Sequence, residues 1–302
     1  PQPHAPRLLR VHPLRLETSA DPADVYRGID VETLVALLVR YAAAGLVKGK
    51  SELTALRQRL TARTIDILAG YRLLLARRVP PAKLILPDSL QLLPSYILMA
   101  LKLPALTKEP IRSDARATSC AFVVSSSVLA LIRKLYPRLL RLDKIERGAD
   151  GTPRALHLSR EVLSKRGVYA FVSDTLLWLW VGASAYRHVL VDLFGVGTLA
   201  SIQPMSWLAS RDSDLSREAC AVLTNLRAEL EAELGRSPQF RVIRARDGME
   251  TRLLNMCTED MLVGGGVSPS SQSISYVDYV RIIHSGIQKR IKAENEKQQK
   301  GK

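Results

Sequence analysis

Residues 84–104 read LILPDSLQLLPSYILMALKLP, and this stretch decides how the first half of the chain folds. Pro87 and Pro94 suit the first turn of a helix, where the missing N–H of proline costs nothing. The pattern therefore predicts a short helical turn near Pro87 and a helix over 95–102. That helix has almost no polar face, so we expect it to be buried on nearly all sides, with other helices packed around it.

Two helices are predicted upstream of this stretch. Asp30 is placed to cap the first, which ends near Gly45, and Ser51 to cap the second. We expect one face of the first helix to carry Leu34, Leu37, Leu38 and Tyr41, and the inward face of the second to carry Leu53, Leu56, Leu60, Ile67, Tyr71 and Leu74.

Two more helices are predicted downstream. Ser113 is placed to cap one that runs to Val124, and Ser126 or Ser127 to cap another that runs to Leu135. Pro137 then interrupts the apolar run. The pattern predicts about five helices between residues 22 and 143, and hence an all-α unit over 21–145.

The second half of the chain has a different pattern. Residues 146–154 (ERGADGTPR) are polar and contain glycine and proline, which predicts a linker between two domains. Two domains also suit a length of 302 residues. Beyond the linker, 168–174 (VYAFVSD) and 176–182 (LLWLWVG) predict a β-hairpin whose tryptophans, two positions apart, share one buried face.

Helices and one further strand complete the second half. We expect a short helix over 186–195, a long helix capped by Ser213, a strand over 240–245, a short helix over 250–257 and a terminal amphipathic helix from residue 275. A few strands covered by helices form an α+β layer. The fold class predicted for the whole chain is thus α+β: an all-α domain followed by a mixed domain over 155–302.

The net charge of +15 is unevenly distributed. Residues 1–150 carry +11, residues 151–280 carry −1, and the tail from Arg281 carries +5. The basic surface therefore belongs to the helical half and the tail, and its expected partner is extended and anionic.

One group of basic residues in the helical half is a candidate contact site. We expect Arg57, Arg59 and Arg63 to face water from the second helix, with Arg77, Arg78 and Lys83 in the loop that follows. These residues either bind lipid phosphates or an acidic partner, or form an ordinary solvated helix face. Nucleic acid is not the expected partner, because no aromatic platform or nucleic-acid-binding motif accompanies these residues.

The sequence carries no recognisable catalytic or metal-binding motif. It has no GxSxG, P-loop, HExxH or CxxC pattern, and its five histidines show no ligand spacing, so we expect neither an enzyme nor a cofactor. Cys120, Cys220 and Cys257 are expected to be reduced, buried thiols. No apolar run is long enough for a membrane span.

Several motifs, in this order along the chain, resemble one protein family. LPDSLQLLPSYILMALKLPAL (86–106), RSDARA (112–117) and LIRKLYPRLLRLD (131–143) resemble the helical domain of the cargo-adaptor subunit of the COPII vesicle coat. LLWLWVG (176–182), LVDLFGVGTLASI (190–202) and SYVDYVRIIHSGIQ (275–288) resemble the gelsolin-like domain at the C-terminus of that subunit.

This resemblance implies more about the fold than the residue pattern does. Residues 1–20, with the strand-like stretch 7–18, would be the last strand of a β-sandwich that lies upstream, and residues 155–302 a gelsolin-like domain with a basic C-terminal helix and tail. The family's zinc site also lies upstream. Since the chain lacks an initiator Met, we expect it to be a piece of a longer protein.

The resemblance also implies a function. The protein would be a non-catalytic part of the inner coat that supports cargo selection and transport from the endoplasmic reticulum to the Golgi. It would be cytoplasmic and peripheral on exit-site and vesicle membranes. Its partners would be the sister inner-coat subunit, sorting signals of cargo proteins, an anionic membrane surface and, indirectly, a small GTPase.

Two alternatives stay open at this level. One is an actin-binding gelsolin-type module, and the other is the sister coat subunit that activates the GTPase. Gelsolin repeats also bind calcium through acidic residues, for which Asp174, Glu259 and Asp260 are the nearest candidates here. A glycine- and serine-rich insertion over 263–273 departs from the family pattern.

Overall fold

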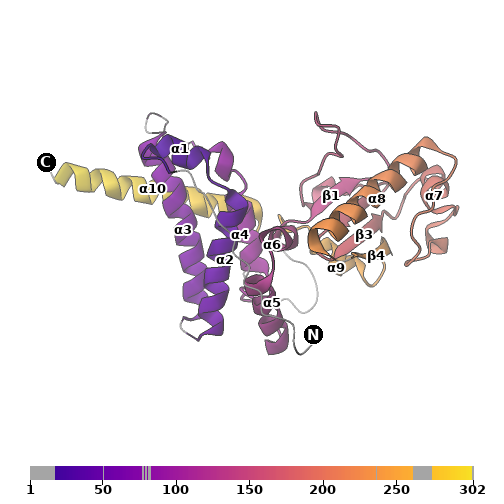
Figure 1. Cartoon of the computed structure of the whole chain (residues 1–302), viewed down its shortest axis with the longest axis horizontal. Helices are drawn as coiled ribbons and strands as arrows, with labels where there is room; N and C mark the ends of the chain where they lie inside the picture. The colour runs from indigo at the N-terminus through magenta and orange to yellow at the C-terminus, as the bar shows by residue number, and fades with distance from the viewer. Residues whose placement is uncertain are drawn as a thin grey trace, which may run out of the picture.

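The computed structural model describes residues 18–49, 51–76, 78, 80, 83–235, 237–260 and 274–300. Within these residues the chain forms two lobes, one helical and one built on a four-stranded sheet (Figure 1). The insertion over 263–273 lies outside the described residues. So does the expected N-terminal strand, apart from residues 18–20, which are not in a strand.

Helices from both ends of the described chain build the helical lobe. They are α1 (Pro22–Arg27), α2 (Val31–Val47), α3 (Leu53–Leu74), the 3-10 turn η1 (Asp88–Leu90), α4 (Leu93–Lys102), α5 (Ser113–Ser125), α6 (Val128–Leu135) and α10 (Tyr276–Lys300). The sequence pattern did not predict α1. It did predict the turn η1 and the helix α4, with α4 beginning two residues earlier than expected.

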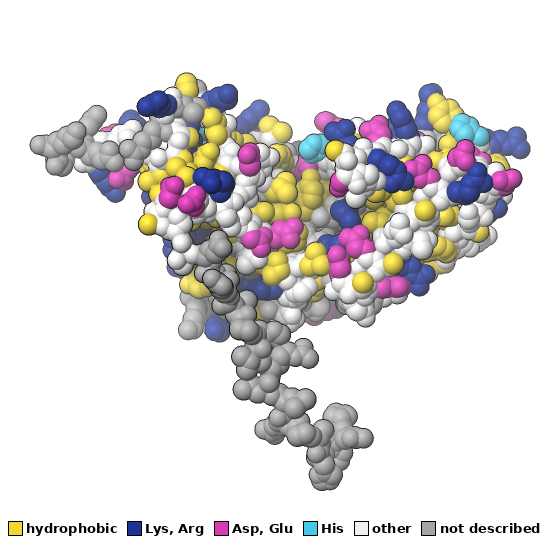
Figure 2. All heavy atoms as spheres, turned by 45° about the horizontal axis from the view of Figure 1, so that its top comes forward, with side chains coloured by type: hydrophobic (Ala, Val, Ile, Leu, Met, Phe, Trp, Pro, Cys, Tyr) yellow, Lys and Arg dark blue, Asp and Glu magenta, His cyan; other side chains and the backbone are white. Residues whose placement is uncertain are grey.

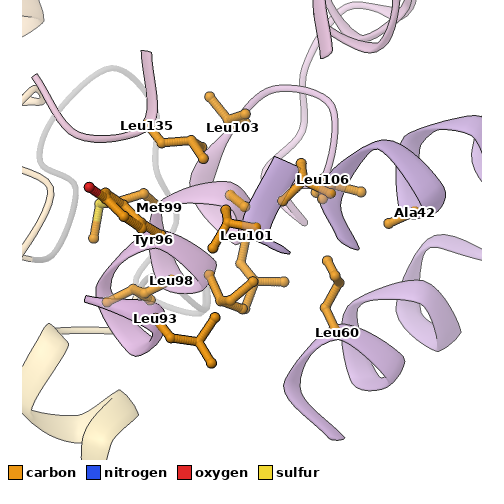
Figure 3. Packing of buried hydrophobic residues seen from close by; sticks show 14 of the residues in the cluster. Ala42, Leu60, Leu93, Tyr96, Leu98, Met99, Leu101, Leu103, Leu106 and Leu135 are labelled. Carbon is orange, nitrogen blue, oxygen red and sulfur yellow. The ribbon is translucent and has the colours of Figure 1, made fainter. Parts of the chain in front are cut away.

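Helix α4 is the centre of this lobe, as predicted. Every residue from Leu93 to Leu101 is buried, and α4 packs against α2, α3, α6 and α10. Figure 3 shows side chains of α4 in one apolar cluster with Leu135 from α6, Leu60 from α3 and Ala42 from α2. A helix with no polar face is stable in water only when neighbours cover it all round, and these neighbours do.

The caps were predicted only in part. Asp30 caps α2 by accepting a hydrogen bond from the Glu32 N–H (3.0 Å), and Ser127 caps α6 through the Ala130 N–H (3.1 Å). The caps expected at Ser51 and Ser113 are wrong, since α3 begins after Glu52 and α5 begins after Arg112, neither with a side-chain cap.

The face of α2 that packs inward was also predicted wrongly. Leu37 and Tyr41 are 65% and 72% exposed, and the leucines expected beside them are only partly buried. The fully buried side of α2 consists instead of the small residues Val35, Ala36, Val39, Ala42 and Ala43. Small side chains let α4, α5 and α6 approach α2 closely, so packing distance, more than side-chain hydrophobicity, decided which face is buried.

The second lobe is a sheet with helices on both faces. Its strands are β1 (Arg138–Arg141), β2 (Val168–Val172), β3 (Leu176–Val181) and β4 (Gln239–Arg244), in spatial order β1-β2-β3-β4. The first three strands pair antiparallel, and β3 and β4 pair parallel. Helices α7 (Arg187–Phe194) and α8 (Asp214–Leu234) form the connection from β3 to β4, and α9 (Glu250–Leu254) follows β4.

Alternation along β3 assigns its side chains to two cores. Leu177, Leu179 and Val181 pack in the cluster that includes α7 and α8. Trp178 and Trp180 pack on the other face with residues of α9, which confirms the predicted buried tryptophan face. The predicted hairpin, the Ser213 cap of α8 and the strand now called β4 are confirmed as well.

The packing departs from the expected domain division at two places. Strand β1 precedes the predicted linker but belongs to the sheet, because Leu139 and Leu140 pair with β2 and lie in the two sheet cores. Helix α10 was assigned to the gelsolin-like domain, but its Tyr279, Ile283 and Ile287 are buried in the core of the helical lobe. In Figure 1, α10 accordingly runs across α3 and away from the sheet.

The segment 146–154 should be cleaved early by proteases. It is exposed except at Pro153, and only short contacts hold it, such as the pairing of Arg147 with Pro153 and the 2.7 Å ion pair of Arg147 with Glu218. We expect limited trypsin digestion to cut within 146–154 before it cuts the bond after Lys102. Mass spectrometry of the first fragments tests this, and an initial cut after Lys102 would contradict the central position of α4.

Candidate functional site

The structure separates the predicted basic cluster into two groups. Arg59 and Arg63 are exposed on α3, whereas Arg78 and Lys83 are exposed beyond the end of the same helix. Because α3 continues about 16 Å past Arg63, the two groups do not form one patch. Arg77 lies outside the described residues.

Arg57 is half-buried and hydrogen-bonded to backbone, so the expectation that it faces water was wrong. Its guanidinium donates hydrogen bonds to the backbone carbonyls of Leu101 and Leu106. Burial of the group lowers the pKa of Arg57 below the ordinary value. Arg57 follows the buried Leu56 on α3, and it therefore stands at the edge of the inward face, where it fastens α3 to the end of α4.

Arg59 and Arg63 stand beside an apolar groove between α2 and α3. The groove has a volume of about 320 Å³, and its other lining residues are Leu38, Tyr41, Ala42, Leu56, Leu60, Ala62 and Asp66. Asp66 is paired with Arg290 of α10 at 2.8 Å. The groove therefore combines exposed cations with apolar walls, a chemistry that suits an anionic partner with an apolar part.

A hydrogen-bonded junction joins the two lobes at the end of α4. The ammonium group of Lys102 donates to the backbone carbonyls of Thr258 (2.6 Å) and Asp260 (2.7 Å). Burial is the main reason that the pKa of Lys102 falls to about 8. Beside it, the Tyr136 hydroxyl donates to Glu259 at 2.5 Å, and burial together with this carboxylate raises the pKa of Tyr136.

A second junction links α6 and β1 with α8. Arg133, almost fully buried, donates to Glu229 (2.7 Å) and to Glu233, and Arg138 donates to Glu229 at 2.8 Å. Burial works against the charge of Glu229, but the hydrogen bonds from Arg138 and Arg133 outweigh it and lower the pKa of this carboxyl. With two such junctions, the helical lobe and the sheet lobe are held in one arrangement.

Sequence reasoning did not find these junctions. Their partners lie about a hundred residues or more apart in the chain, and no spacing rule connects Lys102 with Thr258 or Arg133 with Glu229. The only available signal was the presence of basic residues at the ends of two otherwise apolar helices.

Each of the three acidic residues considered for calcium is engaged by other groups of the protein. Asp174 is buried beside Lys134 (3.7 Å), Glu259 accepts from Tyr136, and Asp260 accepts from Ser159 and from the Arg160 N–H. Within the part of the chain that the structure describes, no three His, Cys, Asp or Glu side chains form a metal-binding group.

The cysteine thiols are not activated as nucleophiles. The three cysteines are unpaired thiols, and burial raises the pKa of Cys120 and raises that of Cys257 to about 12. His157 is exposed near Glu259, and His188 stacks on Tyr186.

None of the described helices has the length and hydropathy that crossing a bilayer requires.

Comparison with known proteins identifies the helical lobe first. Residues 30–133 match the model of the Sec23/Sec24 helical domain family. This range contains α2 to α5 and most of α6, including the central helix α4.

Relatives and a solved structure extend the similarity to almost the whole chain. Protein transport protein Sec24C of Homo sapiens is 32% identical over 283 residues, which is 93% of this chain and 25% of that protein. Sec24A of Mus musculus is 30% identical over 94% of this chain and 26% of its own length. The crystal structure of the human COPII-coat protein Sec24c superposes with a TM-score of 0.73 at 30% identity, covering 89% of this chain and 34% of that one.

The match includes both lobes, because 89% of the chain cannot be covered by either lobe alone. The chain spans about a quarter of the length of the curated relatives that it matches. With a helical domain of this family, a sheet lobe after it and Sec24 relatives along nearly its full length, the chain belongs to the Sec24 family of protein transport proteins.

Proposed function

We propose that this chain is a structural, non-catalytic part of a cargo adaptor of the inner COPII coat, which supports cargo selection and transport from the endoplasmic reticulum to the Golgi. The superposition on the human COPII-coat protein Sec24c is the observation that carries this proposal. The two junctions between the lobes support it further, since a coat subunit must hold its shape while other subunits assemble on it.

The proposal includes partners and a location. The full protein would pair with the sister inner-coat subunit, mainly through domains outside this chain, and would bind sorting signals of cargo proteins. A small GTPase would recruit it indirectly to the cytoplasmic face of exit-site membranes. No observation on the described residues favours an actin-binding module or the GTPase-activating subunit.

Recruitment of a chimeric coat subunit tests this function. The corresponding C-terminal segment of human Sec24C would be replaced by this chain, and binding to liposomes would be measured with the sister subunit and the activated GTPase. We expect GTPase-dependent recruitment close to that of the parent protein. A folded chimera that stays unbound, or a chain that instead sediments with actin filaments, would contradict the proposal.

The exposed cations of α3 are proposed to contact the membrane. Each basic group near an anionic surface contributes on the order of 1 kcal/mol, and the attraction decays within roughly 8–10 Å at physiological salt. Arg59 and Arg63 meet the requirement of exposure, whereas Arg57 does not. The membrane contact therefore rests on Arg59 and Arg63 and not on the whole predicted cluster.

Charge reversal of these two arginines should weaken attachment to anionic liposomes. We expect the double variant Arg59→Glu, Arg63→Glu to float less with anionic liposomes than the parent does, and 0.5 M salt to remove most of the difference. The matched control is Arg154→Glu, Lys165→Glu, which makes the same charge change at exposed positions of the sheet lobe. Equal flotation of the two double variants would leave Arg59 and Arg63 as a solvated helix face.

A further inference from the structure

A cavity of about 200 Å³ lies between the two lobes, next to the Lys102 junction. Residues of α4, α6, β3 and α9 line it, together with the segment after α9. Its apolar walls include Met99, Leu135, Leu176 and the ring of Trp178. At roughly 30 Å³ for each water-sized group, the volume accommodates about six or seven such groups, so the cavity suits a small ligand or one residue of a peptide.

The charged side chains that line the cavity are all cationic. Lys102, Lys134 and Arg252 contribute to its lining, and no carboxylate does so among the described residues. Lys134 has Asp174 at 3.7 Å, and the Arg252 guanidinium lies over the Trp178 ring, 5.4 Å from its centroid. Three cations around one cavity favour an anionic occupant.

Hydrogen-bond donors at the cavity lack acceptors. Lys102 has three N–H groups, and the described residues supply two acceptors for them, the carbonyls of Thr258 and Asp260. The indole N–H of Trp178, a residue 1% exposed, and the hydroxyl of Thr258 have no hydrogen-bond partner among the described residues. Buried donors without partners are costly, and a ligand that accepts from them removes this cost.

We propose that this cavity binds a carboxylate carried on a short apolar body, with the carboxylate near Lys102, Lys134 and Arg252 and the body against the methionine and leucine walls. A fully hydrated anion such as inorganic phosphate fits less well, since most of the wall cannot replace its water. The carboxylate belongs either to a free aliphatic acid or to the end of a peptide chain.

The protonation of Lys102 makes this binding depend on pH. Burial lowers the pKa of Lys102 to about 8; Asp260 and Glu259 favour its charged form, whereas Arg160 opposes it. Lys134, Arg252 and Asp174 are the other charged groups near the cavity. A bound carboxylate favours the ammonium form and raises this pKa, so binding takes up a proton above about pH 8 and weakens as the pH rises through that value.

The NMR resonance of the Trp178 indole N–H provides the test, assigned by its loss in Trp178→Phe. Isovalerate and the neutral isovaleramide have the same apolar body. Of this pair, we expect only isovalerate to shift the Trp178 indole N–H resonance in a saturable way. A valine-terminated tripeptide and its C-terminal amide form the second pair. If the tripeptide shifts the resonance and isovalerate does not, the carboxylate that the cavity binds is the end of a peptide chain. If both shift it, the cavity binds either a free acid or a chain end.

Variants of the lining cations complete the experiment. Lys134→Met, at a partly exposed side chain, should weaken isovalerate binding at least fivefold, and the distant Lys144→Met should leave it unchanged. Binding should also weaken several-fold from pH 7 to pH 9. Equal binding of isovaleramide or phosphate, or unchanged binding by both Lys134→Met and Arg252→Gln, would overturn the proposal.

Discussion

Leu98→Asp is expected to lower the free energy of unfolding by about 3–5 kcal/mol, a large share of the stability of an ordinary domain. Leu98 is 1% exposed and belongs to the apolar core that α4 shares with α2, α3, α6 and α10. A carboxylate placed in this apolar cluster would lose its water, which costs several kcal/mol. Thermal and urea unfolding followed by circular dichroism measure the effect.

Leu92→Asp is the matched control, because it makes the same chemical change at the edge of the same helix. Leu92 is 45% exposed and occupies the N-cap position of α4 without a capping side chain, a position at which aspartate is favourable. The free energy of unfolding of the Leu92→Asp variant should be equal to or slightly above that of the parent. Parent-like melting of Leu98→Asp itself would show that α4 is not the centre of the lobe.

Gly182→Ala should lower the free energy of unfolding by about 2–3 kcal/mol. A Cβ atom at Gly182, which follows β3, would lie 2.2 Å from the backbone oxygen of Lys165. That oxygen accepts a hydrogen bond from the Ser184 N–H at 2.8 Å, so the turn cannot move away without breaking a contact. A backbone clash, unlike a clash with a side-chain end, has no rotamer that relieves it.

The corresponding change at Gly248 separates this clash from a general effect of alanine. A Cβ atom at Gly248 meets nothing within 4 Å, and its backbone does not need the left-handed region. Gly248→Ala should therefore unfold within about 0.5 kcal/mol of the parent. If both alanine variants unfolded alike, the turn before β2 would not approach β3 as closely as described.

Local pattern was enough to predict most individual elements. Three kinds of feature can be recognised from neighbouring residues alone. They are the apolar run of α4, the alternation around Trp178 and Trp180, and the caps Asp30, Ser127 and Ser213. The same reasoning went wrong for α2, where alanines and valines pack inward and Tyr41 faces out, because the closest approach between helices is a property of the partners and not of one helix.

Contacts between distant parts of the chain were beyond local pattern. Strand β1 is four residues long and follows a helix in an apolar run, and only its pairing with β2 makes it a strand. The amphipathic character of α10 was visible, but its docking on α3 and α4 was not.

The exposure expected of the candidate contact residues was right for Arg59 and Arg63 and wrong for Arg57, and the contact itself stays a prediction. A basic residue in a helix is usually solvated, and this rule holds for Arg59 and Arg63. It fails for Arg57, whose guanidinium donates to the backbone carbonyls of Leu101, in α4, and of Leu106, in the segment after it. The hollow between the lobes, which has hydrophobic side chains at its base in Figure 2, arises only when both lobes are assembled.

Cargo packaging by a chimeric coat subunit tests the proposed adaptor role most directly. Human Sec24C with its C-terminal segment replaced by this chain would be combined with the other coat subunits in a vesicle-budding reaction on endoplasmic reticulum membranes, with the same chimera carrying Leu98→Asp as the inactive control. We expect the chimera to package cargo into vesicles at a level close to that of the parent, and the control to fail. A chimera that is folded and soluble, yet forms no cargo-containing vesicles, would contradict the proposal that this chain is part of a COPII cargo adaptor.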